Sequence, residues 1–177
     1  MLKSYINTLK KISDSIDQKN LDKAIKTIDK AIINKNNIFI CGNGGSASLS
    51  DHALCDWTKR LYPKRKCRVI DLTSNKSLIS AISNDIDHNK IFSFQLDVYS
   101  QKGDVCIFIS SSGNSKNILN GIKFAKKKKL KTIGIFGFDG GKSKNLTDIP
   151  IHCNTNTYEH HEDLAQIVMH YIYLQLK

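Results

Sequence analysis

Five short runs rich in β-branched residues alternate with helix-length segments, and this alternation restricts the fold more than any other feature of the sequence. The short runs span residues 37–41, 68–72, 104–109, 132–136 and 149–153. Helical patterns cover residues 46–60, 77–83, 90–99, 115–128 and 158–176. Parallel strands need crossover connections, which helices supply. We therefore predict an α/β fold, a three-layer doubly wound parallel sheet of about five strands flanked by helices.

An amphipathic helical pattern precedes the first predicted strand. Apolar side chains recur at helical spacing through residues 6–16 and again through residues 21–32, with residues 17–20 as a break between two helices. Such a stripe packs either on the domain's own sheet or on a second subunit. Because 177 residues suit one domain, we predict a single domain over residues 1–177 with residues 1–35 as a helical extension.

Lysine dominates the charge of the chain. Lys and Arg number 27 against 16 Asp and Glu, which gives a formal net charge of +11. This balance suits nucleic acid, anionic surfaces or phosphorylated substrates. The basic residues concentrate at residues 126–129 and 64–66, without the interleaved aromatic residues that stack on bases. We interpret the charge as a solvated surface and expect no nucleic-acid partner.

The apolar runs and the cysteines indicate the cellular compartment. No run approaches the ~20 apolar residues of a membrane-spanning helix, and the first five residues lack the apolar core of a signal peptide. The cysteines, Cys41, Cys55, Cys67, Cys106 and Cys153, are odd in number and show no C-x-x-C spacing. We expect a cytoplasmic protein without a membrane partner, whose thiols are reduced and structural.

Two strands run directly into polar, glycine-containing turns that lead into helices. Residues 41–46 read Cys-Gly-Asn-Gly-Gly-Ser, and residues 110–115 read Ser-Ser-Ser-Gly-Asn-Ser. In a doubly wound sheet, ligands bind at the carboxyl ends of strands, where backbone N–H groups and helix N-termini favour anions. Neither turn is a Walker A loop or a G-x-G-x-x-G fingerprint. Either turn alone could be a plain loop, but the pair favours a site for one phosphate monoester.

The helix after the first turn carries a histidine and a carboxylate one turn apart. His52 and Asp56 are four residues apart, so both side chains project from one helical face. Such a pair can ligate a divalent metal or take part in proton transfer. The alternative is a surface pair without a function.

The last helix carries a second set of polar side chains on one face. Glu162, Gln166 and His170 follow one another at steps of four. A histidine on an amphipathic helix can equally be a packed or capping residue. At the start of the same helix, His160 and His161 are interpreted as exposed side chains.

These motifs follow one another in a characteristic order. They are Gly-Asn-Gly-Gly-Ser at 42–46, His52 with Asp56, Ser-Asn-Asp at 83–85, the serine-rich turn at 110–115, and Glu162 with His170. Together they resemble the sugar isomerase (SIS) domain of phosphoheptose isomerases, and the resemblance covers the whole chain. It implies an enzyme that converts sedoheptulose 7-phosphate to D-glycero-D-manno-heptose 7-phosphate through an enediol(ate), the first step of nucleotide-activated heptose synthesis for surface glycans. It also implies a homotetramer, joined partly by the N-terminal helices, with sites at subunit interfaces.

The resemblance further implies a role for each matching residue. The phosphate would lie against Ser110, Ser112 and Ser115, with Ser46 nearby, and Ser111 would be a further substrate contact. Other substrate contacts would come from Asn43, Gly44, Gly45, Asp56, Asn84, Asp85 and Glu162. The ligands of one zinc ion would be His52, Asp56, Glu162 and His170. The acid/base pair would be Asp56 and His170.

Two positions depart from the pattern of the family. Asp56 stands where glutamate is common, and Glu162 stands where glutamine is common. The shorter carboxylate would lie about one methylene farther from the sugar, whereas the added carboxylate should bind a divalent cation more tightly. Some SIS domains are non-catalytic regulators that bind a replication initiator protein, and this is the alternative function. Those relatives tend to lose the acid/base carboxylate, which this chain keeps.

Overall fold

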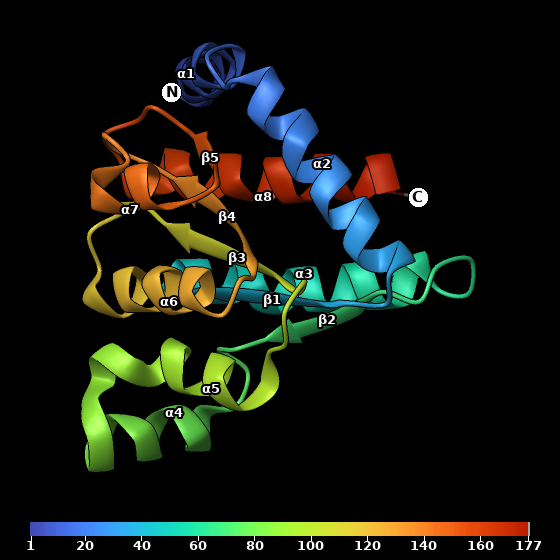
Figure 1. The fold of residues 1–177 in the computed structure, drawn as a ribbon. Coiled ribbons are helices and arrows are strands. Elements are labelled where there is room, and N and C mark those ends of the chain that lie inside the picture. The colour runs from blue at the N-terminus through green and yellow to red at the C-terminus, as the bar shows by residue number, and fades with distance from the viewer. Residues whose placement is uncertain (177) are drawn as a thin grey trace.

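The computed structural model describes residues 1–176 and contains a sheet with helices on both faces (Figure 1). The strands are β1 (Asn37–Gly42), β2 (Arg68–Asp71), β3 (Val105–Ser110), β4 (Lys131–Phe136) and β5 (Ile149–His152). All neighbouring strands pair in parallel, in the order β2-β1-β3-β4-β5. The predicted doubly wound parallel sheet is confirmed, and each strand lies within about one residue of its predicted bounds.

Eight α-helices surround this sheet in the described part of the chain. They are α1 (Leu2–Asp14), α2 (Gln18–Ile33), α3 (Gly45–Leu61), α4 (Lys76–Ile82), α5 (Ile91–Tyr99), α6 (Lys116–Lys127), α7 (Gly141–Leu146) and α8 (Tyr158–Leu176). A π-helical turn (Ser83–Asp87) and a 3-10 turn (His88–Lys90) connect α4 to α5. The sequence pattern missed α7, because its six residues carry no apolar stripe.

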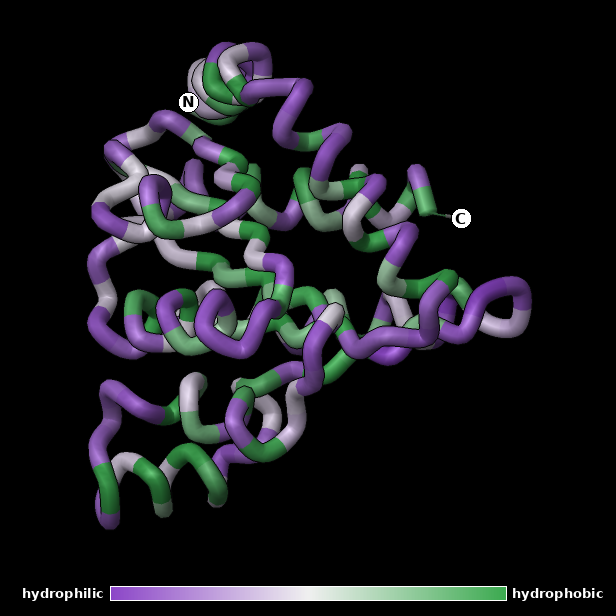
Figure 2. Tube along the Cα trace, in the orientation of Figure 1, coloured by the Kyte–Doolittle hydropathy of each residue, from purple (hydrophilic) through white to green (hydrophobic). Residues whose placement is uncertain are grey.

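Both faces of the sheet are buried, as a parallel sheet requires. Alternate residues of a strand point to opposite faces. Ile107 and Ile109 of β3 therefore join the core beneath α2, α3 and α8, whereas Cys106 and Phe108 join the core beneath α5 and α6. Figure 2 shows the hydrophobic positions that interrupt the mostly hydrophilic helix α2, the pattern of a helix that buries one side.

The N-terminal helices pack on the domain's own core. Helix α2 buries Leu21, Ala24 and Ile28 against the core that also contains β3 and β5. Helix α1 buries only Leu9 and Ile12. The chain turns between the two helices where the Asp17 side chain accepts a hydrogen bond from the N–H of Lys19 and caps α2.

The connection between β1 and β3 creates the crevice in which the motifs lie. From β1 the chain crosses to the edge strand β2 and returns to β3 beside β1, whereas from β3 it continues in the opposite direction to β4 and β5. Ligands bind at such a reversal of strand order, outside the carboxyl ends of the strands. Residues 41–46, the glycine turn, and residues 110–115, the serine turn, leave the sheet there side by side.

The buried thiols fit the structural role expected of the cysteines. All five cysteines are free, and Cys55 alone among them is exposed. Burial raises the pKa of Cys67 and of Cys153 to about 12, so both remain protonated thiols. None of the described helices has the length and apolar character needed to cross a bilayer.

Candidate active site

The glycine turn and the serine turn enclose a cavity of about 300 Å³ at the carboxyl ends of β1 and β3. Its lining comprises Asn43, Gly44, Gly45, Ser46, Ile109, Ser110, Ser111, Ser112, Ser115, Tyr158 and Glu162. The structure therefore brings together all the substrate contacts expected from the two turns, with Glu162 of α8 beside them. Tyr158 is an additional wall residue that the sequence motifs did not indicate.

Two helix N-termini open on this cavity. Helix α3 starts directly after Gly44, and α6 starts directly after Ser115. The first N–H groups of a helix lack partners within the helix and favour anions. Ser110 Oγ accepts a hydrogen bond from the N–H of Gly113, and Ser112 Oγ accepts one from the N–H of Asn114, each at 3.2 Å. Both hydroxyls therefore retain a hydrogen to donate to an anion.

A Cβ at either of two glycine positions of these turns would meet a neighbouring group, and at Gly113 that neighbour is backbone. Gly113 has φ +60°, and a Cβ there would collide with the carbonyl oxygen of Gly140. A Cβ on Gly45 would collide with the carboxylate of Glu162. Glu162 thus lies directly against the start of α3. No lysine or arginine among residues 1–176 lines the cavity, so an anion held by these residues depends on N–H groups and hydroxyls.

A buried histidine lies behind the serine turn. His161 of α8 is 0% exposed, and its Nδ1 lies 2.8 Å from Ser111 Oγ. Burial lowers the pKa of His161 to about 4, so the imidazole is neutral. The sequence-based interpretation of His161 as exposed is wrong, because the residue continues the buried stripe of Leu164, Ala165 and Val168. The helical spacing of three, four and seven residues from His161 to these apolar side chains could have identified His161 as buried.

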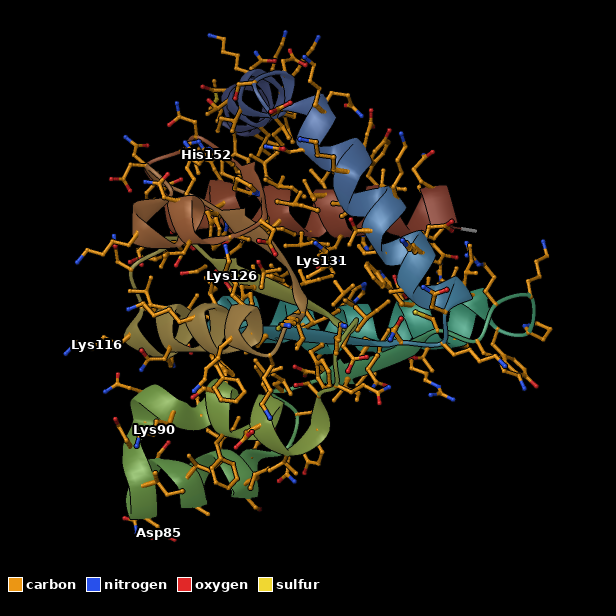
Figure 3. All side chains as sticks on the ribbon, in the orientation of Figure 1. Asp85, Lys90, Lys116, Lys126, Lys131 and His152 are labelled. Atoms are coloured by element: carbon orange, nitrogen blue, oxygen red, sulfur yellow. The ribbon has the colours of Figure 1, made fainter. Side chains whose placement is uncertain are left out.

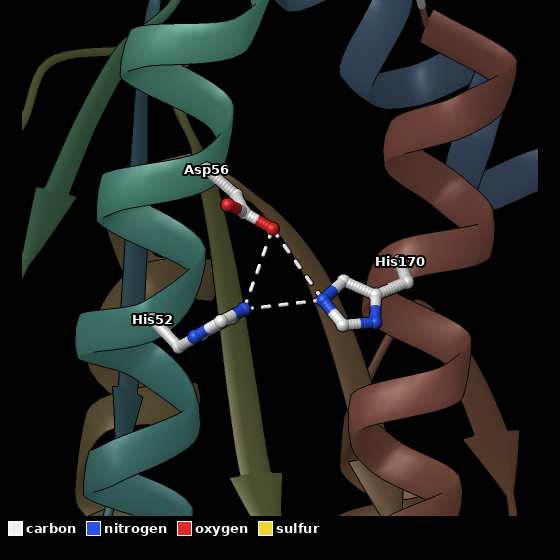
Figure 4. Close-up of side chains that lie close together, drawn as sticks. All are labelled: His52, Asp56 and His170. Atoms are coloured by element: carbon white, nitrogen blue, oxygen red, sulfur yellow. Dashed lines mark hydrogen bonds and ion pairs between the residues drawn. The ribbon is translucent and has the colours of Figure 1, made fainter.

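A second group of polar side chains gathers between α3 and α8 (Figure 4). Asp56 Oδ2 lies 3.3 Å from His52 Nε2 and 3.4 Å from His170 Nε2. The two imidazole nitrogens are 3.1 Å apart. The Asp56 side chain is only 15% exposed, while the imidazoles are about half exposed. The structure therefore joins the predicted pair on α3 to the predicted histidine on α8.

The three ligand atoms fit one face of a tetrahedral zinc site. Zinc–nitrogen and zinc–oxygen bonds of about 2.0–2.1 Å set the edges of the coordination tetrahedron at roughly 3.3–3.4 Å. The two edges at Asp56 measure 3.3 and 3.4 Å, and the third edge measures 3.1 Å. Two imidazoles and a carboxylate, with one position open, form a donor set that catalytic zinc sites use. These residues could hold zinc.

Comparison with known proteins identifies the family. The family model described as SIS domain matches residues 2–137. The phosphoheptose isomerase of Aliarcobacter butzleri is 39% identical over 147 residues, which cover 82% of this chain and 77% of that protein. The phosphoheptose isomerase of Helicobacter pylori strain P12 is 38% identical over 149 residues, covering 84% and 77% respectively. The chain belongs to the phosphoheptose isomerase family of SIS-domain proteins.

Solved structures of phosphoheptose isomerases share this fold. The enzyme of Neisseria gonorrhoeae superimposes with a TM-score of 0.92 at 24% identity, over 99% of this chain and 94% of that one. The enzyme of Francisella tularensis gives a TM-score of 0.92 at 22% identity, over 99% and 93%. The architecture of the phosphoheptose isomerase family therefore extends over the described chain, N-terminal helices included.

Some residues that match the family's motifs lie away from both the cavity and the cluster. Asn84 and Asp85 are exposed on the π-helical turn, where Asn84 Nδ2 donates a hydrogen bond to Asp85 Oδ1 at 2.7 Å. Figure 3 shows Asp85 at the outer end of this part of the molecule. Neither residue lines the cavity. Glu162 lines the cavity but is not among the described residues whose ligand atoms gather within 4.8 Å at Asp56.

Two further side chains contact the cluster. Gln166 Nε2 lies 2.8 Å from His170 Nε2, and Arg60 Nε lies 3.5 Å from Asp56 Oδ1. Gln166 shares the helical face of His170, so the spacing of four indicated it. Arg60 lies four residues after Asp56 in the same way, but an exposed arginine carries no motif of its own.

Proposed function

We propose that this chain is an aldose-ketose isomerase that converts sedoheptulose 7-phosphate to D-glycero-D-manno-heptose 7-phosphate. Membership of the phosphoheptose isomerase family supports this assignment. The structural observation that carries it is the Asp56 carboxylate held between two imidazoles, in the same subunit as a cavity formed by two helix N-termini. The product would enter nucleotide-activated heptose synthesis for surface glycans.

The phosphate of the substrate is assigned to the serine turn. Hydroxyls of Ser110, Ser112 and Ser115, with N–H groups at the start of α6, would donate hydrogen bonds to its oxygens. Ser46 lies nearby at the start of α3 and is buried. The remaining lining of the glycine turn, from Asn43 to Gly45, is left for the sugar hydroxyls.

Proton transfer is assigned to Asp56 and His170. The reaction moves a proton between adjacent carbons, so it needs a base near the carbon and an acid near the oxygen. The Asp56 carboxylate would take the carbon-bound proton, leaving the electron pair in an enediol(ate), and would return the proton to the neighbouring carbon. His170 would hold and exchange the proton of the reacting oxygen.

We assign one zinc ion to His52, Asp56, Glu162 and His170. Bound zinc would act as a Lewis acid that polarises the sugar carbonyl. The near-tetrahedral distances among three of these residues support the assignment. Glu162 is the fourth ligand expected from the family's pattern, and its carboxylate would have to turn from Gly45 toward His170 to join them.

We further propose a cytoplasmic homotetramer of single-domain subunits, with active sites at subunit interfaces. Ile167, Tyr171 and Leu174 are exposed on α8, the helix that carries His170. A second subunit covering this face would shield the cluster from water. Asn84 and Asp85 would likewise approach substrate across an interface, which would explain why they lie outside the cavity of their own chain.

The decisive experiment is an assay of the purified protein with sedoheptulose 7-phosphate, with and without a chelator. We expect isomerisation in the untreated sample and its loss after chelation. A protein without turnover, in the presence of added zinc, would overturn the assignment. No observation favours the alternative of a non-catalytic regulator, which has no need of the Asp56 cluster.

A further inference from the structure

The side-chain amide of Asn117 is buried at the start of α6, and all of its hydrogen-bonding capacity is used. Asn117 is only 3% exposed. Its Oδ1 accepts from the N–H of Ile118 at 2.9 Å and from Asn43 Nδ2 at 2.9 Å. Its Nδ2 donates to Asn43 Oδ1 at 3.0 Å and faces His88 Nε2 at 3.3 Å. Two acceptor and two donor contacts complete the capacity of an amide.

The orientation of this amide is determined by its neighbours. A backbone N–H can only donate, so the Asn117 atom that faces the N–H of Ile118 must be the oxygen. The other atom is then the NH₂ group, which also can only donate. It follows that His88 Nε2, which faces this NH₂ group, must accept and carries no hydrogen.

The same reasoning sets the tautomer of His88. A neutral imidazole with a bare Nε2 carries its hydrogen on Nδ1. His88 Nδ1 lies 3.0 Å from Ser83 Oγ, so it donates to that hydroxyl. One continuous chain of hydrogen bonds therefore runs from Asn43 in the glycine turn through Asn117 and His88 to Ser83.

This series of hydrogen bonds connects three segments that are distant in sequence. Asn43 lines the cavity, Asn117 belongs to the helix that follows the serine turn, and Ser83 begins the π-helical turn that carries Asn84 and Asp85. Both polar atoms of the Asn43 amide are engaged by Asn117, which restricts its rotation. A fully satisfied polar network of this kind rigidifies the groups that it joins.

We propose that Asn117 and His88 are positioning residues, which orient Asn43 toward the sugar and fix the position of the Ser83–Asp87 turn relative to α6. The proposal rests on the proposed function in that Asn43 contacts the sugar part of a sugar phosphate. Asn43 keeps one N–H and one oxygen lone pair for that contact. Neither Asn117 nor His88 touches the reacting atoms.

The tautomer of His88 can be tested without any assay of activity. In protein labelled with ¹⁵N-histidine, at mildly alkaline pH, we expect the ring nitrogens of His88 to show hydrogen on Nδ1 and none on Nε2. The His88 signals are identified by their loss in His88→Gln. In Asn117→Leu, which removes the donor, we expect the Nδ1–H form to lose its dominance. A dominant Nε2–H form of His88 in the unaltered protein would overturn the proposal.

A matched pair of variants at His88 tests the effect on substrate. Gln at this exposed position offers an oxygen that can accept from Asn117 Nδ2, whereas Phe offers none. Because a hydrogen bond contributes about 1 kcal/mol, we expect His88→Phe to raise KM for sedoheptulose 7-phosphate roughly fivefold to tenfold. We expect kcat to change little, since the lost binding is common to ground and transition states, and His88→Gln to stay close to the unaltered protein.

Inhibition by inorganic phosphate shows whether His88→Phe disturbs only the orientation of Asn43 or the whole binding site. Phosphate binds the serine turn in the proposed function, so its inhibition constant should not change in His88→Phe. An unchanged KM in His88→Phe, or equal effects of Phe and Gln, would refute the positioning role. If the unaltered protein shows no isomerase activity, the proposed function fails, while the tautomer measurement still decides whether the Asn43–Ser83 connection exists.

Discussion

The cavity between the two turns and the cluster of His52, Asp56 and His170 are built in different ways. The cavity is made of backbone N–H groups and short hydroxyl side chains, placed by neighbouring strands that end at the same edge of the sheet. The cluster is made of one carboxylate and two imidazole side chains from the middle of α3 and the second half of α8, and its two histidines are 118 positions apart in sequence. In the proposed function, binding would therefore depend on strand topology, whereas chemistry would depend on how α3 and α8 are rotated against each other.

The largest expected effect lies in the cluster. Asp56→Asn and His170→Gln should each lower kcat by about 10²- to 10⁴-fold, the usual loss when a general acid or base is removed. Both changes are modest in volume, so thermal unfolding should stay close to that of the unaltered protein. Steady-state kinetics with sedoheptulose 7-phosphate measures the effect. Near-normal kcat in both variants would mean that the cluster does not carry out proton transfer, and would contradict its proposed catalytic role.

A longer carboxylate sharpens the same test. Asp56→Glu introduces the side chain that the family commonly has at this position, and we expect activity equal to or above that of the unaltered protein. A kcat as low as that of Asp56→Asn would mean that α3 has shifted to suit the shorter residue. The comparison of the Glu and Asn variants thus separates the need for a carboxylate from the need for its reach.

Metal removal should act on the cluster and spare the cavity. We expect chelation to lower kcat by about 10²- to 10³-fold, the several kcal/mol that a Lewis acid supplies, and zinc to restore it. Competitive inhibition by inorganic phosphate should persist in a chelated sample that retains measurable turnover. Elemental analysis should find one divalent ion per active site. A metal-free preparation with full turnover would contradict the zinc assignment.

His161 lies behind the serine turn of the cavity, and its effect should appear in stability as pH falls. Burial holds its pKa at about 4 in the folded protein, against an ordinary value of 6.5. Between these values the unfolded chain binds a proton that the folded chain excludes, so acidification favours unfolding. The free energy of unfolding should fall by up to about 3 kcal/mol more in the unaltered protein than in His161→Leu. Urea unfolding from pH 7 to pH 4 measures this difference, and parallel pH profiles would contradict it.

The smallest effect is expected in the cavity. Ser112→Ala should raise KM for the sugar phosphate about tenfold with little change in kcat, because it removes binding common to ground and transition states. KM and kcat of Ser110→Ala and Ser115→Ala should be measured alongside those of Ser112→Ala. An unchanged KM in all three variants would mean that the phosphate binds elsewhere. A fall in kcat with unchanged KM would mean that the serine turn takes part in the chemical step and not only in binding the phosphate.

The sheet could be predicted from sequence because each strand is a short run rich in β-branched residues between helix-length segments. The two turns could be predicted because strand, turn and helix are contiguous in sequence. Residue spacing alone predicted the cluster only as two separate helical faces, since their meeting depends on how α3 packs on α8. The family resemblance was what placed His52, Asp56 and His170 in one site. Asn117 was missed because a single asparagine in a first helical turn carries no motif, and its partners Asn43 and His88 are distant in sequence.

The placement of β1 beside β3 has a consequence for how this scaffold can change. The chain between the end of α3 and the start of β3 leaves the sheet centre, forms the edge strand β2 and returns to the neighbouring position. This excursion can lengthen, shorten or acquire new side chains while the two turns stay adjacent. It also carries Asn84 and Asp85. If the proposed function holds, a protein built this way could alter which sugar it recognises without rebuilding the turns assigned to phosphate.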